Sequence, residues 1–139
     1  MASTNPGPAV TTSNHPQNLS SNQAIRLLAY AQGVNLNATG DTVMPVIDST
    51  TYSVKNVVLT NASISLTTAA AGVFTAPSAA GTAIVANAAL SAATGPTVVS
   101  ERTVASTAAQ SGQNLYVNVG TAQGAAATGD IYVYGYDFS

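Results

Sequence analysis

Short runs rich in valine, isoleucine, threonine and tyrosine recur along most of this chain, and turn-forming residues separate them. The clearest run, YSVKNVVLT at 52–60, has Val57 and Leu59 on one face and Val54 and Val58 on the other. Such runs are typical of β-strands. Apolar side chains on both faces indicate a central strand that is covered on both sides. The pattern therefore predicts an all-β fold.

Six further runs predict strands at residues 42–47, 63–68, 72–76, 82–88, 114–120 and 130–138. Turn sequences such as TGD at 39–41 and TGP at 94–96 separate them. Pro45 cannot donate a hydrogen bond to a ladder, so its strand is expected at a sheet edge. Residues 100–113 have weak periodicity and are expected to form a loop or an irregular strand. About eight short strands favour an antiparallel two-sheet sandwich, jelly-roll-like rather than immunoglobulin-like.

Residues 24–33 fit two patterns. Ile25, Leu28 and Ala29 would share one face of a helix that ends at Gly33. Alternate apolar residues instead describe a strand that continues past a bulge at Gly33: Ile25, Leu27, Ala29, Ala31, Val34 and Leu36. The strand is the preferred interpretation.

The length of 139 residues suits one domain with its own core. Residues 1–22 are rich in proline, serine, threonine and asparagine, so they predict a flexible or extended N-terminal arm. A single β-sandwich domain is expected over residues 23–139. Such an arm is either a frayed terminus or a segment that becomes ordered along a neighbouring subunit. In the second case Pro6, Pro8 and His15 are candidate contact residues.

Charged residues are scarce, because three basic and five acidic side chains serve the whole chain. About a quarter of an ordinary soluble domain is charged. No stretch is apolar for long enough to cross a membrane, so the surface must consist of neutral polar and small residues. A neutral surface gives little electrostatic repulsion between copies. This composition suits a subunit of an assembly better than a freely diffusing monomer.

Several chemistries lack the residues that they require. Cysteine is absent, which excludes disulfides and thiolate metal sites. Three scattered basic residues do not form the patch that nucleic-acid binding requires. The only histidine, His15, lies in the arm, so neither a metal site nor a Ser-His-Asp triad is expected. No phosphate-binding glycine loop occurs, and we expect no cofactor and no enzymatic activity.

The five acidic residues are dispersed and match no calcium-binding loop. Asp41 and Asp130 lie at predicted turns and could meet in space, but each acid is expected to serve a turn or an exposed ion pair. Glu101 and Arg102 are adjacent, and we interpret them as a solvated pair rather than as a site.

The last predicted strand carries a row of tyrosines. Tyr132, Tyr134 and Tyr136 fall on one face, and Ile131 and Val133 fall on the other. Tyrosine is amphipathic and enriched at protein interfaces, so an outward-facing row would suit contact between subunits. In the alternative arrangement the tyrosines point inward with their hydroxyl groups at the edge of the core.

Four phrases resemble small virion proteins that are encoded among the head genes of tailed bacteriophages: YSVKNVVLTNAS at 52–63, TTAAAGVFTAP at 67–77, LYVNVGTAQG at 115–124 and DIYVYG at 130–135. Over residues 34–136 the chain resembles a capsid decoration or cement protein. The resemblance implies a β-sandwich or jelly-roll subunit that forms homodimers or homotrimers on the capsid exterior. It also implies that the protein bridges neighbouring major capsid proteins.

Such a protein would be assembled in the host cytoplasm, and its partners would include neither nucleic acid nor a membrane. The N-terminus agrees with this expectation, because it lacks the basic and apolar regions of a secretory signal. The candidate contacts with the shell are the arm together with Tyr116, Tyr132, Tyr134 and Tyr136.

Two other functions compete with the virion protein. In a carbohydrate-binding, fibre or adhesin sandwich, Tyr116, Tyr132 or Tyr134 would stack on sugar rings. A pilus or surface-layer subunit would have a similar neutral composition, but it should carry an export signal.

Overall fold

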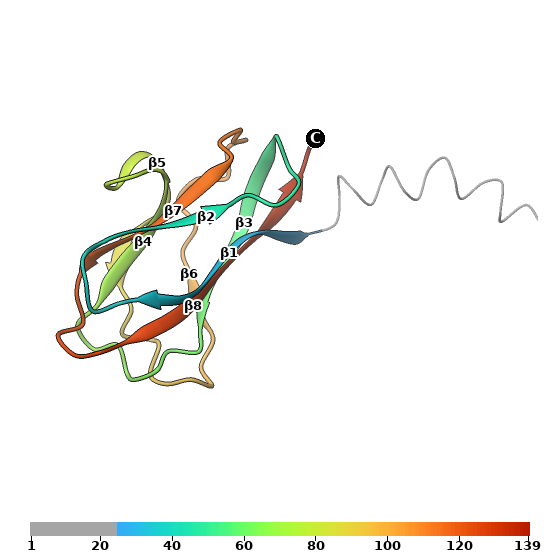
Figure 1. The fold of residues 1–139 in the computed structure, drawn as a ribbon. Helices are drawn as coiled ribbons and strands as arrows, with labels where there is room; N and C mark the ends of the chain where they lie inside the picture. Colours follow the sequence, from blue (N-terminus) through green and yellow to red (C-terminus); the bar gives the residue numbers. More distant parts are fainter. Residues whose placement is uncertain (1–24) are drawn as a thin grey trace, which may run out of the picture.

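The computed structural model describes residues 25–139, which form eight strands in two packed antiparallel sheets and no helix (Figure 1). The strands are β1 (Arg26–Asn35), β2 (Gly40–Pro45), β3 (Tyr52–Thr60), β4 (Ala70–Ala76), β5 (Ala80–Ala89), β6 (Ser100–Arg102), β7 (Asn114–Thr121) and β8 (Thr128–Asp137). The predicted all-β two-sheet sandwich is confirmed. The predicted arm, residues 1–22, lies outside the described residues.

One sheet has the order β1-β8-β3-β6 and the other has the order β2-β7-β4-β5. The pairs are nested in the sequence, because β1 pairs with β8, β2 with β7, β3 with β6 and β4 with β5. Every connection except the β4–β5 hairpin therefore passes from one sheet to the other. As a consequence, neither sheet can be completed before the chain has supplied strands to both.

β1 shows that the ambiguous segment is a strand, as the preferred interpretation held. Its pairing with β8 shifts register twice, between Leu27 and Ala29 and between Ala31 and Val34. The second shift contains Gly33, where a bulge was expected and where φ is +65°. The first shift was not anticipated. It leaves the side chain of Leu27 only partly buried.

β3 is a central strand, as predicted, with β8 and β6 as its neighbours. The predicted distribution of its side chains is wrong at Val54, which shares the buried side with Val57. The reason is a register shift between Val54 and Asn56, at which Lys55 is an extra residue on the bulged strand. Of the two valines predicted for the outer side, only Val58 lies there, opposite Tyr132 of β8.

β2 is an edge strand that ends at Pro45, as the sequence predicted. The strand predicted at 63–68 is wrong, because these residues form bends. Their backbone is bound by Gln123, whose side-chain oxygen accepts hydrogen bonds from the amides of Thr68 and Ala69, each at 3.0 Å. The amides of Ser63 and Leu66 donate instead to the carbonyl oxygens of Thr128 and Ala93. Separate contacts with several segments thus replace the partner strand. Residues 100–113 contain the short strand β6 and are otherwise irregular, in agreement with the prediction.

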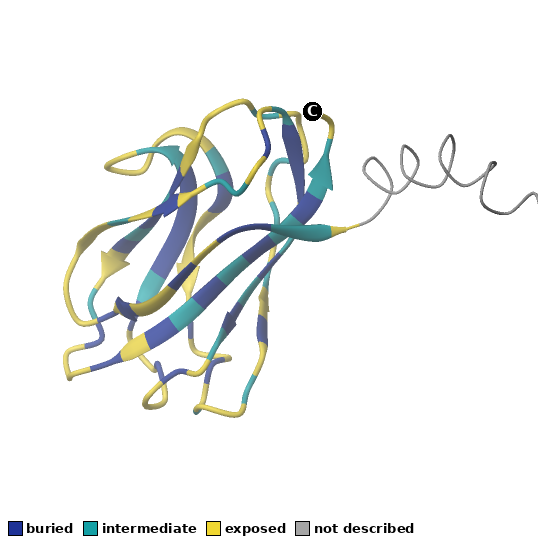
Figure 2. Cartoon of the chain, turned by 45° about the vertical axis from the view of Figure 1, so that its right-hand side comes forward, coloured by how far each residue is buried: buried dark blue, intermediate teal, exposed yellow. Residues whose placement is uncertain are grey.

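The hydrophobic core lies between the two sheets, and buried residues alternate with less buried ones along β7 and β8 (Figure 2). Each large apolar side chain that is fully buried contributes about 1.5–3 kcal/mol to folding. The largest are Tyr52, Leu28, Leu36, Met44, Leu59, Leu66, Ile84, Leu90 and Leu115. The hydroxyl of Tyr52 donates to the carbonyl oxygen of Gly112 at 2.6 Å, and burial raises the pKa of Tyr52 above 10.0.

The backbone of β3 leaves no room for a side chain at Gly135 of β8. A Cβ atom built there would collide with the carbonyl oxygen of Ser53 and lie 2.8 Å from Cδ1 of Leu28. Glycine is therefore required at this buried position of β8, where any side chain would push the strands apart.

Candidate interaction surface

The tyrosine row of β8 lies on the outer side of the β1-β8-β3-β6 sheet. Along β8, Ile131, Val133 and Gly135 are buried toward the core, whereas the alternate tyrosines are partly buried. The structure thus decides between the two arrangements that the sequence left open, in favour of the outward-facing row. Because β8 is a central strand, the row runs along the middle of the sheet and not along an edge.

Residues of the flanking strands extend this row into a surface. In the register of the sheet, Tyr132 lies between Tyr30 of β1 and Val58 of β3, and Leu27 of β1 is opposite Tyr134. The name tyrosine face is used below for six residues: Leu27, Tyr30, Val58, Tyr132, Tyr134 and Tyr136. At the end of the face where β1 begins and β8 ends, Ile25 and Phe138 are about half exposed.

Tyr30 is the most exposed ring of the tyrosine face, at 45%. Its ring stacks on that of Tyr132 with centroids 6.2 Å apart and planes inclined by 22°. The Nε2 group of Gln32 donates to the hydroxyl of Tyr132 at 2.9 Å. The two rings are thus held side by side with an amide beside them, so a ligand or a partner would meet a preformed aromatic platform.

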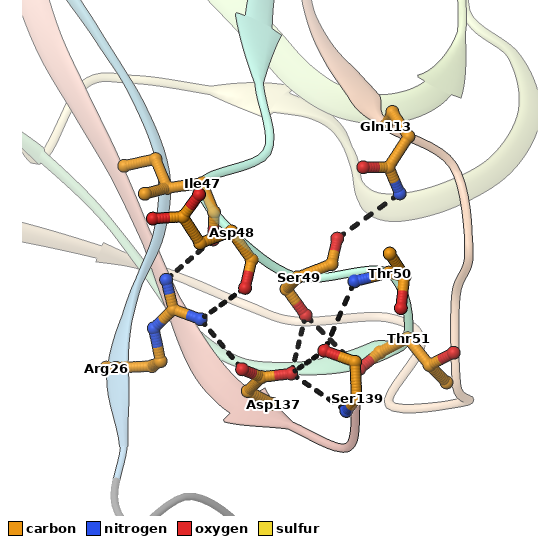
Figure 3. A network of polar contacts seen from close by, with 9 residues as sticks. All are labelled: Arg26, Ile47, Asp48, Ser49, Thr50, Thr51, Gln113, Asp137 and Ser139. Carbon is orange, nitrogen blue, oxygen red and sulfur yellow. Dashed lines mark hydrogen bonds and ion pairs between the residues drawn. The ribbon is translucent and has the colours of Figure 1, made fainter.

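A polar cluster closes the end of the sandwich next to this face (Figure 3). Arg26, at the start of β1, donates to a carboxylate oxygen of Asp137 at 3.0 Å and to the carbonyl oxygen of Ile47 at 2.6 Å. Asp137 also accepts hydrogen bonds from the hydroxyl groups of Ser49, at 2.9 Å, and Ser139, at 2.6 Å. The cluster fastens both the first and the last described strands to the loop after β2.

Hydrogen bonds from the hydroxyl and amide of Ser139, supported by Ser49 and by the charge of Arg26, lower the pKa of Asp137 to about 2. Partial burial opposes this shift but does not cancel it. The carboxylate therefore stays ionised over the whole ordinary pH range and acts as an acceptor, not as an acid or a base.

Tyr116 does not belong to the tyrosine face. It is a partly buried residue of β7, in the other sheet, where the register places it between Val43 of β2 and Phe74 of β4. The four tyrosines that the sequence singled out therefore cannot contribute to one flat contact. Pro6, Pro8 and His15, the candidate contacts in the arm, lie outside the described residues.

The two acidic residues that the sequence placed at turns lie in β2 and β8; Asp41 binds the β4–β5 turn, as expected, whereas Asp130 binds the bulge of β1. Asp41 accepts from the amide of Ser78 at 2.8 Å, and Asp130 accepts from the amide of Gly33 at 2.8 Å. Across residues 25–139, no cluster of three or more acidic or histidine side chains is suited to hold a metal ion.

The expected solvated pair of Glu101 and Arg102 is wrong. The only ion pair of the described residues joins Arg26 to Asp137, and Arg102 is partly buried on the inner side of β6 while Glu101 is exposed. Adjacent residues of a strand point to opposite faces, and although both residues line one cleft at the edge of β6, no ion pair joins them.

Sequence reasoning missed Leu27, Tyr30 and Val58 as parts of the tyrosine face. If Ala29 is buried, alternation along a strand places Tyr30 on the outer face. This inference requires knowing that the segment is a strand and that it pairs with β8. The bulges near Leu28 and Lys55 changed which residues of β1 and β3 face outward. A bulge depends on pairing with a partner strand, so a local pattern gives no sign of it.

The fold and the surface define this chain as an all-β sandwich with an aromatic outer face. No protein-family model, curated protein or solved structure matches it. The part of the chain that the structure describes contains no helix that is long and apolar enough to span a membrane.

Proposed function

We propose that this chain is a structural virion protein that decorates a phage capsid and stabilises it by bridging neighbouring major capsid proteins. The observation that carries the proposal is the tyrosine face, a broad aromatic surface on an almost uncharged domain. We further propose that the sandwich is a jelly roll, because its strand pairs are nested from β1 with β8 to β4 with β5.

The chemistry of the tyrosine face suits a permanent contact. A tyrosine ring has a large apolar area and few rotatable bonds. Its hydroxyl group can form a hydrogen bond at the solvated rim of an interface. Tyr132, Tyr134 and Tyr136 are partly buried by their neighbours, so little side-chain entropy remains to be lost on docking. A modest interface per subunit becomes effective when many copies act on one shell.

The distribution of charge supports the same function. Arg26 and Asp137 neutralise each other in an ion pair, and none of the six residues of the tyrosine face is charged. The exposed Lys55 lies in the bulge of β3, next to Asn56, which is opposite Tyr134. A contact that leaves Lys55 at its wet edge therefore desolvates no unpaired ion. The low charge also permits dense packing of copies, because repulsion between like surfaces is weak.

The test is co-sedimentation of the purified chain with expanded phage heads that lack a decoration protein, with analytical ultracentrifugation of the chain alone. We expect saturable binding with a fixed stoichiometry by a homodimer or homotrimer. The substitution Tyr134→Ser should weaken binding by at least about tenfold. Tyr116→Ser is the matched control, because it removes a partly buried tyrosine from the opposite sheet.

Absence of binding by a folded wild-type chain would refute the proposal. Equal loss in the two variants would refute the assignment of the contact to the tyrosine face.

The stacked pair of Tyr30 and Tyr132 favours a second candidate, a carbohydrate-binding or fibre module. An exposed aromatic platform with the amide of Gln32 beside it can stack on a sugar ring and bind its hydroxyl groups. A glycan array tests this candidate. A specific hit that Tyr30→Ala abolishes would support it, whereas an array without hits would leave the virion protein as the better proposal.

A further inference from the structure

Two sheet edges meet on the side of the sandwich that is remote from β1 and β2. β5 is the last strand of one sheet and β6 is the last strand of the other. Between them lies a cleft of about 190 Å³, which is lined by Val85, Ala86, Ala88, Glu101, Arg102, Thr103 and Ala105. A water molecule takes about 30 Å³ of liquid volume, so the cleft is large enough for a small polar group and the methylenes that carry it.

Arg102 is the basic residue of this cleft, and its guanidinium is poorly satisfied. One terminal nitrogen donates to the carbonyl oxygen of Ala89 at 3.0 Å and makes a long contact of 3.5 Å with that of Ala88. The other terminal nitrogen has only a long contact of 3.5 Å with the hydroxyl of Ser100. The Nε group is buried and has no hydrogen-bond partner. A guanidinium has five N–H donors, and buried donors are rarely left unpaired.

No carboxylate of the described residues forms an ion pair with Arg102, since the ion pair of this part of the chain joins Arg26 to Asp137. Burial lowers the pKa of Arg102, as expected for a desolvated cation without a counter-ion. Arg26 shows the contrast, because its guanidinium contacts both a carboxylate and a backbone carbonyl oxygen at 3.0 Å or less. Of the two arginines in the chain, one is therefore satisfied and the other is not.

We propose that the cleft between β5 and β6 binds a carboxylate side chain, aspartate or glutamate, from a partner polypeptide, with Arg102 as its counter-ion. The planar guanidinium can hold a carboxylate through two parallel hydrogen bonds. The small apolar lining from Val85, Ala86, Ala88 and Ala105 accepts the methylene groups that carry it.

We assign this carboxylate to another molecule, because none of the described acids pairs with Arg102. Residues 1–24 contain no aspartate or glutamate. Of the five acids of the chain, Asp41, Asp130 and Asp137 are engaged in the contacts described above. Asp48 lies beside Arg26, and Glu101 lines the cleft but forms no ion pair with Arg102. A phosphate group suits the cleft less well, because Glu101 also lines it and no second basic residue is present to offset a dianion.

Arginine Nε–H signals in NMR spectra provide a direct test, because the chain has only two arginines and Arg26 serves as an internal control. The probe is N-acetyl-glutamate N-methylamide, and the matched neutral probe is the glutamine analogue. We expect a saturable shift of the Arg102 signal in the millimolar range, as for an isolated fragment. The Arg26 signal should not move, and the neutral probe should have no effect.

Substitutions then identify the groups responsible. Arg102→Gln should abolish the response, detected through the amide signals of Thr103 and Ala105, while Arg102→Lys should weaken it because the ammonium group lacks the planar fork. Glu101→Gln should strengthen binding, since it removes a like charge from the cleft. If Arg102→Gln fails to fold, the comparison of Glu101→Gln with the wild type still provides a test.

Three outcomes would overturn the proposal: no shift of the Arg102 signal, an equal shift with the neutral probe, or tighter binding of inorganic phosphate than of the glutamate probe. The inference does not depend on the proposed function, because the titration uses the isolated chain. Failure to bind capsids would leave a positive titration intact, and a negative titration would leave capsid binding by the tyrosine face intact.

Discussion

Tyr30 and Tyr132 stack across the β1–β8 ladder with ring centroids 6.2 Å apart, although about a hundred residues separate them in the sequence. The contact joins an edge strand to a central strand on the outer side of the sheet. The stacking is expected to stabilise the fold, and it shapes the tyrosine face. Its effect on the free energy of unfolding can be measured separately from its effect on binding.

A double-mutant cycle with Tyr30→Ala and Tyr132→Ala should give a coupling free energy of about 0.5–1.5 kcal/mol, the usual range for an aromatic pair in a stacked arrangement. Urea denaturation of the two single variants and the double variant measures this energy. Strictly additive losses would show that the rings lie side by side without interacting.

Gly135→Ala should destabilise the fold by about 1–3 kcal/mol or more, because the new methyl group would meet the backbone of β3 in a packed core. Gly95→Ala is the matched control, since nothing lies within 4 Å of the position of its Cβ atom. The control should change the free energy of unfolding by less than about 0.5 kcal/mol. Similar urea midpoints for the two variants would argue against close approach of β8 and β3.

Gln123→Ala should cost about 2–3 kcal/mol, because it leaves the buried amide of Ala69 without an acceptor. Gln32→Ala removes the same side chain from an exposed position and should cost less than about 0.5 kcal/mol. Urea denaturation measures the free energy of unfolding of each variant. The two values can be compared if the variants have equal m-values. Should both variants lose little, the segment at 63–68 would be held by something other than Gln123.

Asp137→Asn should be less stable than the wild type at neutral pH, by roughly 1 kcal/mol for a partly exposed ion pair. The pKa of Asp137 is lowered in the folded state to about 2, against an ordinary value near 3.8. A lowered pKa contributes stability above the unfolded value, and this contribution is lost as the pH falls through the folded value. The difference between the two proteins should therefore shrink between about pH 4 and pH 2.

Thermal unfolding of both proteins at a series of pH values measures this difference, and the other acidic residues cancel because they are common to both. A gap in stability that stays constant down to pH 2 would mean that Asp137 has an ordinary pKa.

Much of the fold was predictable from local pattern. Alternation and turn chemistry identified the strands around β2, β3, β4, β5, β7 and β8, and Pro45 correctly marked an edge. The predicted strand at 63–68 failed because residues with strand propensity also suit an extended loop when a side chain such as Gln123 satisfies their backbone. Propensity describes a residue's preferences and does not show whether a partner strand is present.

The candidate site was predictable only in part. The row of Tyr132, Tyr134 and Tyr136 could be seen in the sequence, because period-two alternation is a local property of any strand. The direction of the row could not, since both faces of β8 are rich in large side chains. Arg102 was misinterpreted for a related reason, because adjacency to Glu101 in sequence suggested an ion pair that the structure does not contain.

The sequence by itself determined that this protein is an all-β domain of very low charge, without cysteine and with a tyrosine row in its last strand. Those properties depend only on composition and on short-range periodicity, which do not require any tertiary contact. Only the tertiary structure decided the nested pairing of strands, the bulges of β1 and β3, the outward direction of the tyrosines and the isolation of Arg102 between two sheet edges. Each of these depends on which distant segments pair and how closely they pack. The pairing is determined by the burial of one common core between the two sheets.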